Sequence, residues 1–494
     1  MPVDSQPTRH RCVPRTLAPA VLTALAVAAG TLVGVVPGSA VAASAAPAAD
    51  HRAVRGSNGI GDSYFPLDGN GGIDVRHYRI DQSYDFARGR LRGRTTLRLR
   101  TTQRLRSFHL DLLLPVRSVR VDGRRARFRS THHELRIRPA RPLAAGRTVR
   151  VVVRYAGRPG TRRYAGEQNW LASRDEVAAV NQPHMAPWWF PANDHPSDRA
   201  TFDVRTTVPR GMQVISNGRP VSSRVHGGAV THRWRSTEEM TPYLAFFVAG
   251  RFQRVRADHG DVPGYLAVSR TLPSGARREA MSMLRRTPAV LGWLEDRIGR
   301  EYPFSSTGGV VTGLPLGFAL ENQTRPVYGG LGHNQEWLLV HELAHQWFGD
   351  HVTVHRWRDV WLNEGAATFF ETEYGASRGG PSARDWLRGQ WTTPSGGATF
   401  WKLRVDDPGA ARLFDRRVYT RGAMALQALR HRIGEDDFWA VLRTWLDERG
   451  GSTGSTAQFE ELAQRVSGED LRSFFDAWLR GRTAPARTVL NGWS

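Results

Sequence analysis

Residues 341–345 read His-Glu-Leu-Ala-His, and a second acidic residue, Glu364, follows in the segment Trp-Leu-Asn-Glu-Gly at 361–365. Histidines four residues apart lie on one face of a helix, one turn apart. Two neutral imidazoles in that arrangement can bind one metal ion, and a carboxylate completes the His₂Glu set of a catalytic zinc site. The stretch therefore predicts one zinc ion per chain, with His341, His345 and Glu364 as its ligands.

Glu342, beside the first histidine, is predicted to be the general base that takes a proton from a zinc-bound water. The His-Glu-x-x-His pattern also occurs by chance as a charged turn of an ordinary helix. The carboxylate at Glu364 and its surroundings favour the zinc site over that alternative.

The composition is that of a globular protein, and 494 residues are enough for two or three domains. The formal net charge is +23, and Lys402 is the only lysine, so nearly all the positive charge is arginine. Such a chain binds polyanions weakly at low salt. A nucleic-acid site would be indicated by a basic run with interleaved aromatic residues, and the sequence has none. A solvated arginine surface explains the charge.

The N-terminal residues 1–42 have the pattern of a secretory signal peptide. A basic start precedes an apolar run over 17–36, and Ala-Val-Ala at 40–42 is a small-residue cleavage site. An uncleaved membrane anchor is the alternative, since the run has nearly the length of a membrane span. The only cysteine, Cys12, lies in this segment, so cleavage leaves no thiol and no disulfide.

The rest of the chain is predicted to form a linker over 43–57, a β domain over 58–252 and a catalytic domain over 253–494. Apolar residues alternate with arginines at 97–99 and again at 149–155, which is typical of strands with one buried face. Many short strands between turns indicate an antiparallel β-sandwich or saddle. The fold class is therefore α+β, with a mainly helical second domain.

Within the second domain, the zinc helix is predicted to run from Asn334, as N-cap, to Phe348, with Gly349 as its stop. A second helix runs through Glu364 to Tyr374. Residues 376–410 are expected to be rich in loops. Further helical periodicity covers 278–298, 419–433, 438–447, 457–466 and 471–479.

Several motifs together resemble the M1 family of zinc aminopeptidases, the gluzincins that include aminopeptidase N and leukotriene A4 hydrolase. The matching segments are HELAHQWFGD at 341–350, WLNEG at 361–365, ALEN at 319–322, YTRGA at 419–423 and FPANDHPSDRATF at 190–202. The resemblance implies an N-terminal β domain followed by a thermolysin-like catalytic domain. Because the chain ends at Ser494, soon after the expected end of the catalytic domain, it looks like a short-form member. With the signal-peptide pattern, the expectation is a secreted member of bacterial type.

The resemblance also implies roles for further residues. Tyr419 matches the tyrosine whose hydroxyl donates to the oxyanion of the tetrahedral intermediate. Glu321 matches the glutamate that holds the free α-amino group of the substrate, and a carboxylate can pair with an ammonium only if that group is unblocked. The other substrate-binding residues implied are Ala319, Leu320, Asn322 and Gln182.

The chain departs from the family pattern at three positions. Phe318 replaces the usual glycine and Leu320 the usual methionine, which shifts the expected specificity for the first side chain. Gln182 stands where many members have a second amine-binding glutamate, and an amide cannot pair with ammonium as a carboxylate does. Glu371, two helical turns after Glu364, is a candidate to orient a ligand histidine.

The leading interpretation is a secreted monomeric zinc aminopeptidase that acts on peptides with a free N-terminus. No specific nucleic-acid partner is expected, and no stable membrane anchor after signal cleavage. One alternative is a zinc hydrolase with a relaxed requirement for the amine, such as an endopeptidase. Another is a basic polyanion- or wall-binding module whose zinc only stabilises the fold.

Overall fold

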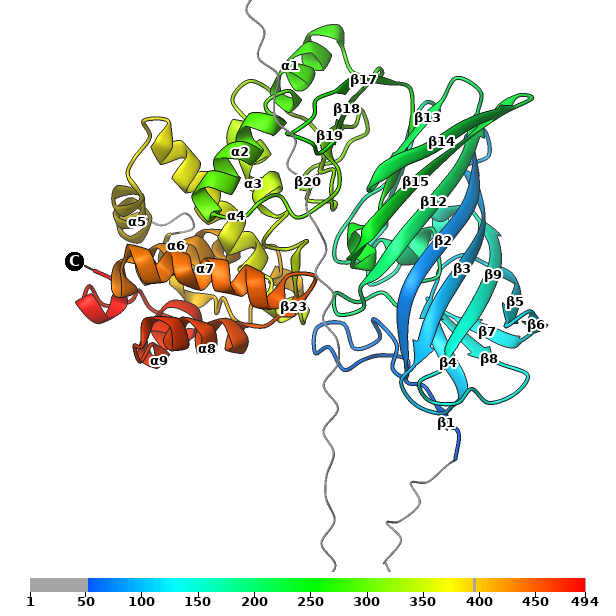
Figure 1. Ribbon diagram of the computed structural model, residues 1–494, viewed down its shortest axis with the longest axis horizontal. Helices are drawn as coiled ribbons and strands as arrows, with labels where there is room; N and C mark the ends of the chain where they lie inside the picture. The colour runs from blue at the N-terminus through cyan, green and yellow to red at the C-terminus, as the bar shows by residue number, and fades with distance from the viewer. Residues whose placement is uncertain (1–51, 394–396, 494) are drawn as a thin grey trace, which may run out of the picture. The chain divides into compact units, whose positions relative to one another are not determined.

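The computed structural model of the chain describes residues 52–393 and 397–493 (Figure 1). The predicted signal peptide, Cys12 and most of the predicted linker lie outside these residues. The described residues belong to one compact unit, so the predicted β and catalytic domains are in contact.

The β domain is built on an eight-stranded sheet with the order β14-β15-β12-β2-β3-β9-β5-β6 (Figure 1). Neighbouring strands are antiparallel except for the parallel pair β2 and β12, so the sheet is not wholly antiparallel as predicted. Leu97 and Leu99 are buried while Arg98 and Arg100 between and after them are exposed, which confirms the predicted alternation. The strands are β2 (Ile73–Asp85), β3 (Arg90–Thr101), β5 (Val116–Val121), β6 (Arg124–Arg125), β9 (Thr148–Gly157), β12 (Ala200–Pro209), β14 (Arg219–His226) and β15 (Ala229–Met240).

Two four-stranded sheets complete this domain. One has the order β1-β4-β8-β7 and the other β10-β11-β16-β13. Strand β1 lies within the segment predicted as a linker and pairs in parallel with β4. The strands are β1 (Val54–Arg55), β4 (Leu105–Asp111), β7 (Arg127–Thr131), β8 (Glu134–Arg138), β10 (Trp170–Ala172), β11 (Val177–Ala179), β13 (Gln213–Ser216) and β16 (Phe247–Gly250).

The second domain adds a five-stranded sheet to a set of helices. The sheet has the order β17-β18-β19-β21-β20 and comprises β17 (Phe252–Arg256), β18 (Gly264–Ser269), β19 (Thr307–Val311), β20 (Ala319–Leu320) and β21 (Val327–Tyr328). A short parallel pair joins β22 (Val352–Val354) to β23 (Ser452–Gly454). The helices are α1 (Ser274–Leu284), α2 (Thr287–Ile298), α3 (Glu336–Ala344), α4 (Trp361–Ser377), α5 (Ala383–Thr392), α6 (Arg416–Ile433), α7 (Glu435–Arg449), α8 (Thr456–Ser467) and α9 (Arg472–Phe475).

Several predicted helix limits differ from the structure. Helix α3 begins at Glu336, and Asn334 does not cap it. It ends at Ala344, where the chain tightens into a turn. The chain then reverses at Gly349, whose φ of 139° suits a residue without Cβ. The segment 278–298 forms two helices, α1 and α2, where one was predicted.

The predicted loop region 376–410 contains helix α5, which the apolar periodicity did not indicate. Ser382 caps this helix by accepting a hydrogen bond from the backbone of Asp385. Serine followed three residues later by an acidic residue is a recognised start signal for a helix. That signal was present in the sequence and would have located α5.

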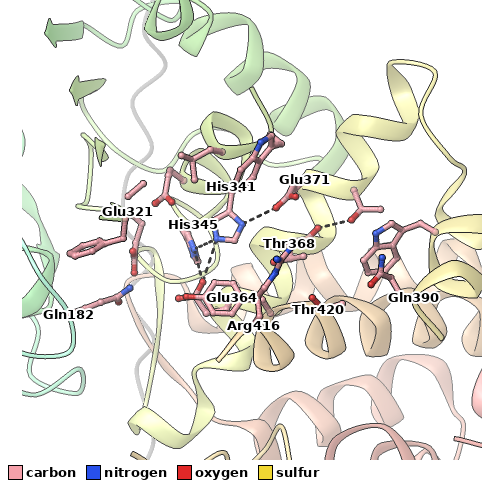
Figure 2. A pocket seen from close by; sticks show the side chains of 18 residues that line it. Gln182, Glu321, His341, His345, Glu364, Thr368, Glu371, Gln390, Arg416 and Thr420 are labelled. Atoms are coloured by element: carbon pink, nitrogen blue, oxygen red, sulfur yellow. Dashed lines mark hydrogen bonds and ion pairs between the residues drawn. The ribbon is translucent and has the colours of Figure 1, made fainter. Parts of the chain in front are cut away.

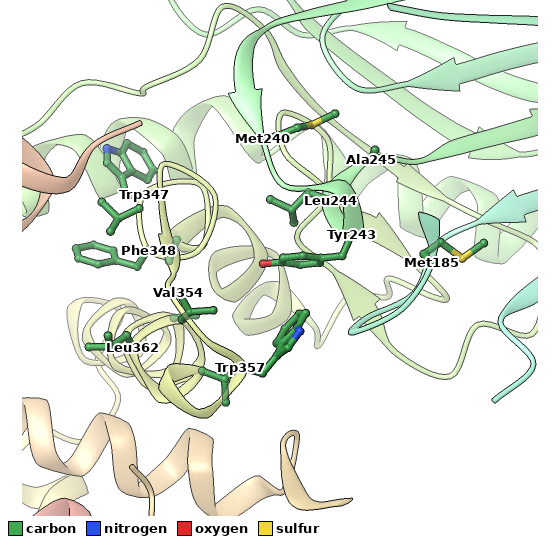
Figure 3. Packing of buried hydrophobic residues seen from close by; sticks show 14 of the residues in the cluster. Met185, Met240, Tyr243, Leu244, Ala245, Trp347, Phe348, Val354, Trp357 and Leu362 are labelled. Atoms are coloured by element: carbon green, nitrogen blue, oxygen red, sulfur yellow. The ribbon is translucent and has the colours of Figure 1, made fainter. Parts of the chain in front are cut away.

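A hydrophobic cluster joins the two domains (Figure 3). The ring of Tyr243, from the end of the β domain, lies 5.1 Å from the ring of Trp357, which immediately precedes α4. The buried guanidinium of Arg199 donates to the carbonyl of Asp350 at 2.9 Å and to that of Glu239 at 2.7 Å. The β domain thus packs directly against the segment that follows the zinc helix.

In the part of the chain that the structure describes, every helix is too short or too polar to cross a membrane.

Candidate zinc-peptidase site

Helices α3 and α4 bring the three predicted metal ligands together (Figure 2). His341 and His345 lie one turn apart on α3 and at its C-terminal end, and Glu364 lies in the first turn of α4. All three are buried. Sequence spacing predicted the histidine pair, and packing of the two helices places the carboxylate against it.

The separations of the donor atoms fit a tetrahedral metal ion. Nε2 of His341 and Nε2 of His345 lie 3.2 Å apart, and they lie 3.5 Å and 3.3 Å from Oε2 of Glu364. Metal–ligand bonds of ~2.0–2.1 Å at tetrahedral angles separate ligand atoms by about 3.3–3.4 Å. Three donors at this spacing, including two imidazole nitrogens in contact, match a zinc-binding set.

The other ring nitrogen of each ligand histidine faces an oxygen atom. Nδ1 of His345 lies 3.1 Å from the carbonyl oxygen of Phe348, to which it can donate. Nδ1 of His341 lies 3.4 Å from a carboxylate oxygen of Glu371 (Figure 2). Such partners fix the orientation of a ligand imidazole, so the structure supports the role predicted for Glu371.

Glu342 is buried beside the ligands, and its Oε2 has no hydrogen-bond partner among the described residues. Burial raises the pKa of its carboxyl to about 8, against the opposing effect of His341 and His345. A carboxyl whose pKa lies near neutrality can both take up and release a proton at that pH. Glu342 therefore has the environment expected of a general base.

Tyr419 reaches the same site from helix α6. Its ring stacks on the imidazole of His341 at 5.9 Å and 16°. Burial, together with the nearby carboxylates of Glu364 and Glu321, raises the pKa of the phenol well above its usual value. The hydroxyl therefore keeps its proton and can donate a hydrogen bond.

Two glycines allow α4 and α6 to pack closely enough to place Tyr419 beside Glu364. A Cβ added to Gly422 would lie 2.9 Å from Cα of Gly365, and one added to Gly365 would lie 2.8 Å from Cα of Gly422. Neither contact is tolerated without movement of a helix. Arg421 anchors α6 further by donating to four backbone carbonyls, those of Trp401, Leu403, Ala477 and Gly481.

The residues implied in substrate binding separate into two groups. Gln182, Ala319 and Glu321 line the cavity that contains the metal ligands. Leu320 is instead buried in the hydrophobic cluster of the five-stranded sheet, and the amide of Asn322 donates to the carbonyl of Leu244. Successive residues of a strand point to opposite faces, so the side chains of Leu320 and Asn322 lie away from the site, contrary to the prediction.

The cavity has a volume of about 540 Å³ and extends well beyond the metal ligands. Glu321 and Gln182 lie on one side of them and Gln390 on the other (Figure 2). The lining also includes Phe318, Trp337, Thr368, Thr372, Trp386, Arg416 and Thr420, of which only Phe318 was named as a substrate-side residue from the sequence. Trp386 and Gln390 come from α5, so failing to predict that helix also hid one wall of the site.

Comparison with known proteins agrees with this geometry. Residues 75–244 match the Peptidase M1 N-terminal domain and residues 332–478 match the Peptidase family M1 domain. Together these matches cover more than half of the chain, in the order β domain and then helical domain. The chain belongs to the M1 peptidase family.

Solved structures of two-domain M1 zinc metallopeptidases share the fold of this M1 chain. A mutant of the Deinococcus radiodurans M1 zinc metallopeptidase bound to a Tyr-Ser-Ala substrate superposes with a TM-score of 0.74 and is 29% identical, with 87% of this chain and 99% of that chain covered. A mutant two-domain M1 zinc metallopeptidase bound to L-tryptophan gives the same values. The fold prediction is therefore confirmed.

Curated relatives of this M1 chain are longer proteins. Leucyl aminopeptidase of Saccharolobus solfataricus is 26% identical over 319 residues, which are 59% of this chain and 39% of that protein. Aminopeptidase N of Streptomyces lividans is 24% identical over 445 residues, which are 82% of this chain and 50% of that protein. The chain thus spans about two fifths to half the length of these relatives.

Proposed function

We propose that this M1 chain is a zinc aminopeptidase that hydrolyses the first peptide bond of substrates with a free N-terminus. The observation that carries the proposal is the position of Glu321. Its buried carboxylate lines the same cavity as the metal ligands and Glu342, and its Oε1 has no hydrogen-bond partner among the described residues. A buried, unpaired carboxylate oxygen facing a cavity suits a cationic ligand group.

The residues of the chain divide the remaining chemistry among them. Zinc, when bound by His341, His345 and Glu364, acts as a Lewis acid and lowers the pKa of a coordinated water. Glu342 takes the proton of the attacking water and then delivers it to the leaving amine. The Tyr419 hydroxyl donates to the oxygen of the scissile carbonyl as negative charge develops on it.

Amine recognition rests mainly on Glu321. Gln182 lines the cavity on the same side and can offer its amide oxygen, but it carries no charge. Phe318 also lines the cavity and is 41% exposed, so of the two departures in the 318–320 segment it is the one that can contact a substrate. We propose that Phe318 adjusts the preference for the first side chain.

The test is a series of aminoacyl fluorogenic amides, each assayed with a free and with an N-acetylated amine. The intact enzyme should cleave the free series and leave the acetylated series nearly untouched. A hydrogen bond to a charged group contributes about 1.5–3 kcal/mol, so Glu321→Gln should lower kcat/KM for free amines by about 10–100-fold. Cleavage of acetylated substrates by Glu321→Gln should stay at the level of the intact enzyme.

Other outcomes of this series have distinct meanings. Equal cleavage of free and acetylated substrates by the intact enzyme would favour the alternative, a zinc hydrolase without an amine requirement. An equal loss on both series in Glu321→Gln, accompanied by loss of zinc, would mean that the substitution damages the metal centre. A chelator should abolish turnover on every substrate, and added Zn²⁺ should restore it.

We also propose that the enzyme is exported and acts as a soluble monomer outside the cytoplasm. The export is supported by the basic, apolar and small-residue pattern of residues 1–42. Protein recovered from the culture medium should yield an N-terminal sequence beginning at Ala43. Recovery of the intact N-terminus in the membrane fraction would instead indicate an anchor.

A further inference from the structure

A second group of metal-ligating side chains is buried in the β domain. Asp111, the last residue of β4, is paired in register with Glu134, the first residue of β8, across an antiparallel ladder. His133 precedes Glu134, and its carbonyl accepts a hydrogen bond from the backbone of Leu112. The exposed fraction is 1% for Asp111, 5% for Glu134 and 1% for His133. Like charges directly opposite each other on neighbouring strands are destabilising, so this placement requires an explanation.

Each carboxylate has one oxygen that is bonded and one that is not. Oδ2 of Asp111 accepts from the backbone of Asp194 at 2.7 Å and from the amide of Asn70 at 3.1 Å. Oε2 of Glu134 lies 3.1 Å from Nδ1 of His109. The other oxygens, Oδ1 of Asp111 and Oε1 of Glu134, are buried and have no hydrogen-bond partner among the described residues. An unpaired buried carboxylate oxygen is costly unless a cation or a proton neutralises it.

Both unpaired oxygens face the same imidazole nitrogen. Nε2 of His133 lies 3.8 Å from Oδ1 of Asp111 and 3.9 Å from Oε1 of Glu134. One donor atom from each of the three residues can be chosen so that all lie within 4.8 Å of one another. The carbonyl oxygen of Leu67 lies 3.2 Å from the same nitrogen. These separations are wider than the 3.2–3.5 Å between the donor atoms of the catalytic set.

The charge around the group is not balanced by arginine in the described residues. The ion pairs of Asp111 and Glu134 involve only His109 and His133, which carry charge only when protonated. The neighbouring His184 is already held between Asp68 and Glu167, at 2.6 Å and 3.3 Å. Asp194 adds a further buried carboxylate, whose Oδ2 also has no hydrogen-bond partner among these residues.

We propose that Asp111, Glu134 and His133 form a second, structural metal site that binds a divalent transition-metal ion, Zn²⁺ or Mn²⁺. Imidazole and carboxylate together suit these ions, whereas Ca²⁺ and Mg²⁺ prefer sites made of oxygen alone. Binding requires the His133 tautomer that carries its proton on Nδ1, so that Nε2 offers its lone pair to the ion in place of its hydrogen bond to the Leu67 carbonyl. The ion then neutralises the two facing carboxylates. It ties β4 to the β7–β8 hairpin independently of the catalytic site.

Metal counting tests the site directly. The full chain is stripped with a chelator, dialysed against Zn²⁺ or Mn²⁺, and its metal content is measured by mass spectrometry. The wild type should bind a second equivalent per chain, and Asp111→Asn and Glu134→Gln should each lose that equivalent while keeping peptidase activity. Asp122→Asn, a matched change in the β5–β6 turn of the same domain, should keep both. In a His345→Ala background, which weakens the catalytic site, the melting temperature should still rise with added metal.

Contrary results are equally specific. A wild type that binds a single equivalent with either ion would mean that the facing carboxyls share a proton and hold no metal. A second equivalent that survives in both Asp111→Asn and Glu134→Gln would place the ion elsewhere. Displacement of the bound Zn²⁺ or Mn²⁺ by equimolar Ca²⁺ would exclude His133 as a ligand, because Ca²⁺ prefers oxygen ligands. If a variant fails to fold, metal-dependent melting of the His345→Ala protein decides the question, since absence of any shift would overturn the site.

Discussion

Glu342→Gln is expected to lower turnover by about 10²–10⁴-fold, the usual contribution of a positioned general acid–base group. Glutamine has nearly the same shape but cannot accept the proton of the attacking water. Glu342 is not among the metal ligands, so the variant should retain zinc. The measurement is kcat on an aminoacyl amide, together with zinc content and melting temperature.

The matched control for this variant is Glu336→Gln on the same helix. Glu336 lies outside the cavity and is bonded to the Tyr374 hydroxyl at 2.7 Å and to Arg286 at 2.6 Å. Its substitution should leave kcat within about twofold, since isolated surface pairs contribute little. Wild-type turnover in zinc-loaded Glu342→Gln would contradict the assignment of the base.

Tyr419→Phe is expected to lower kcat by about 10²–10³-fold with little change in KM, because removal of one oxyanion donor has effects of this size. The hydroxyl acts on charge that develops in the transition state, so its loss should affect the chemical step and not binding. The phenyl ring should keep its stacking on His341, so zinc content should be unchanged. Steady-state kinetics on the free-amine series would measure both constants.

Tyr374→Phe provides the corresponding control on helix α4. It removes a phenol hydroxyl that donates to Glu336, outside the cavity. Its kcat should match the wild type, although the protein should lose roughly 1 kcal/mol of stability with the hydrogen bond. A Tyr419→Phe variant that raised KM alone would show that the hydroxyl holds the substrate and does not stabilise the transition state.

The histidine pair of the candidate metal site was predictable from the sequence because it follows from local helix geometry. His341 and His345 share a face wherever residues 341–345 are helical, and their type and spacing leave few other uses. The strands of the β domain were predictable for a similar reason. Arginines alternate with Leu97 and Leu99 because one face of β3 is buried and the other is exposed.

Side-chain direction at the substrate strand was not predictable in the same way. The motif at 319–322 implied that all four residues serve the substrate, yet Leu320 and Asn322 point into the protein. Which face of a short strand meets the cavity depends on its pairing with β21 and on the packing behind it. Local sequence carries no information about that packing.

The sequence by itself determined the donor set of the candidate zinc site and the family's two-domain order, because these depend on residue types at helical and strand spacings. Only the tertiary structure decided how far the site extends. The approach of Gly365 to Gly422 brings Tyr419 to Glu364, and α5 contributes Trp386 and Gln390 to the cavity wall. It also decided that Asp111 and Glu134 face each other, since strand register brings together residues that are distant in the chain. Long-range packing sets these positions, and it cannot be deduced from spacing along the chain.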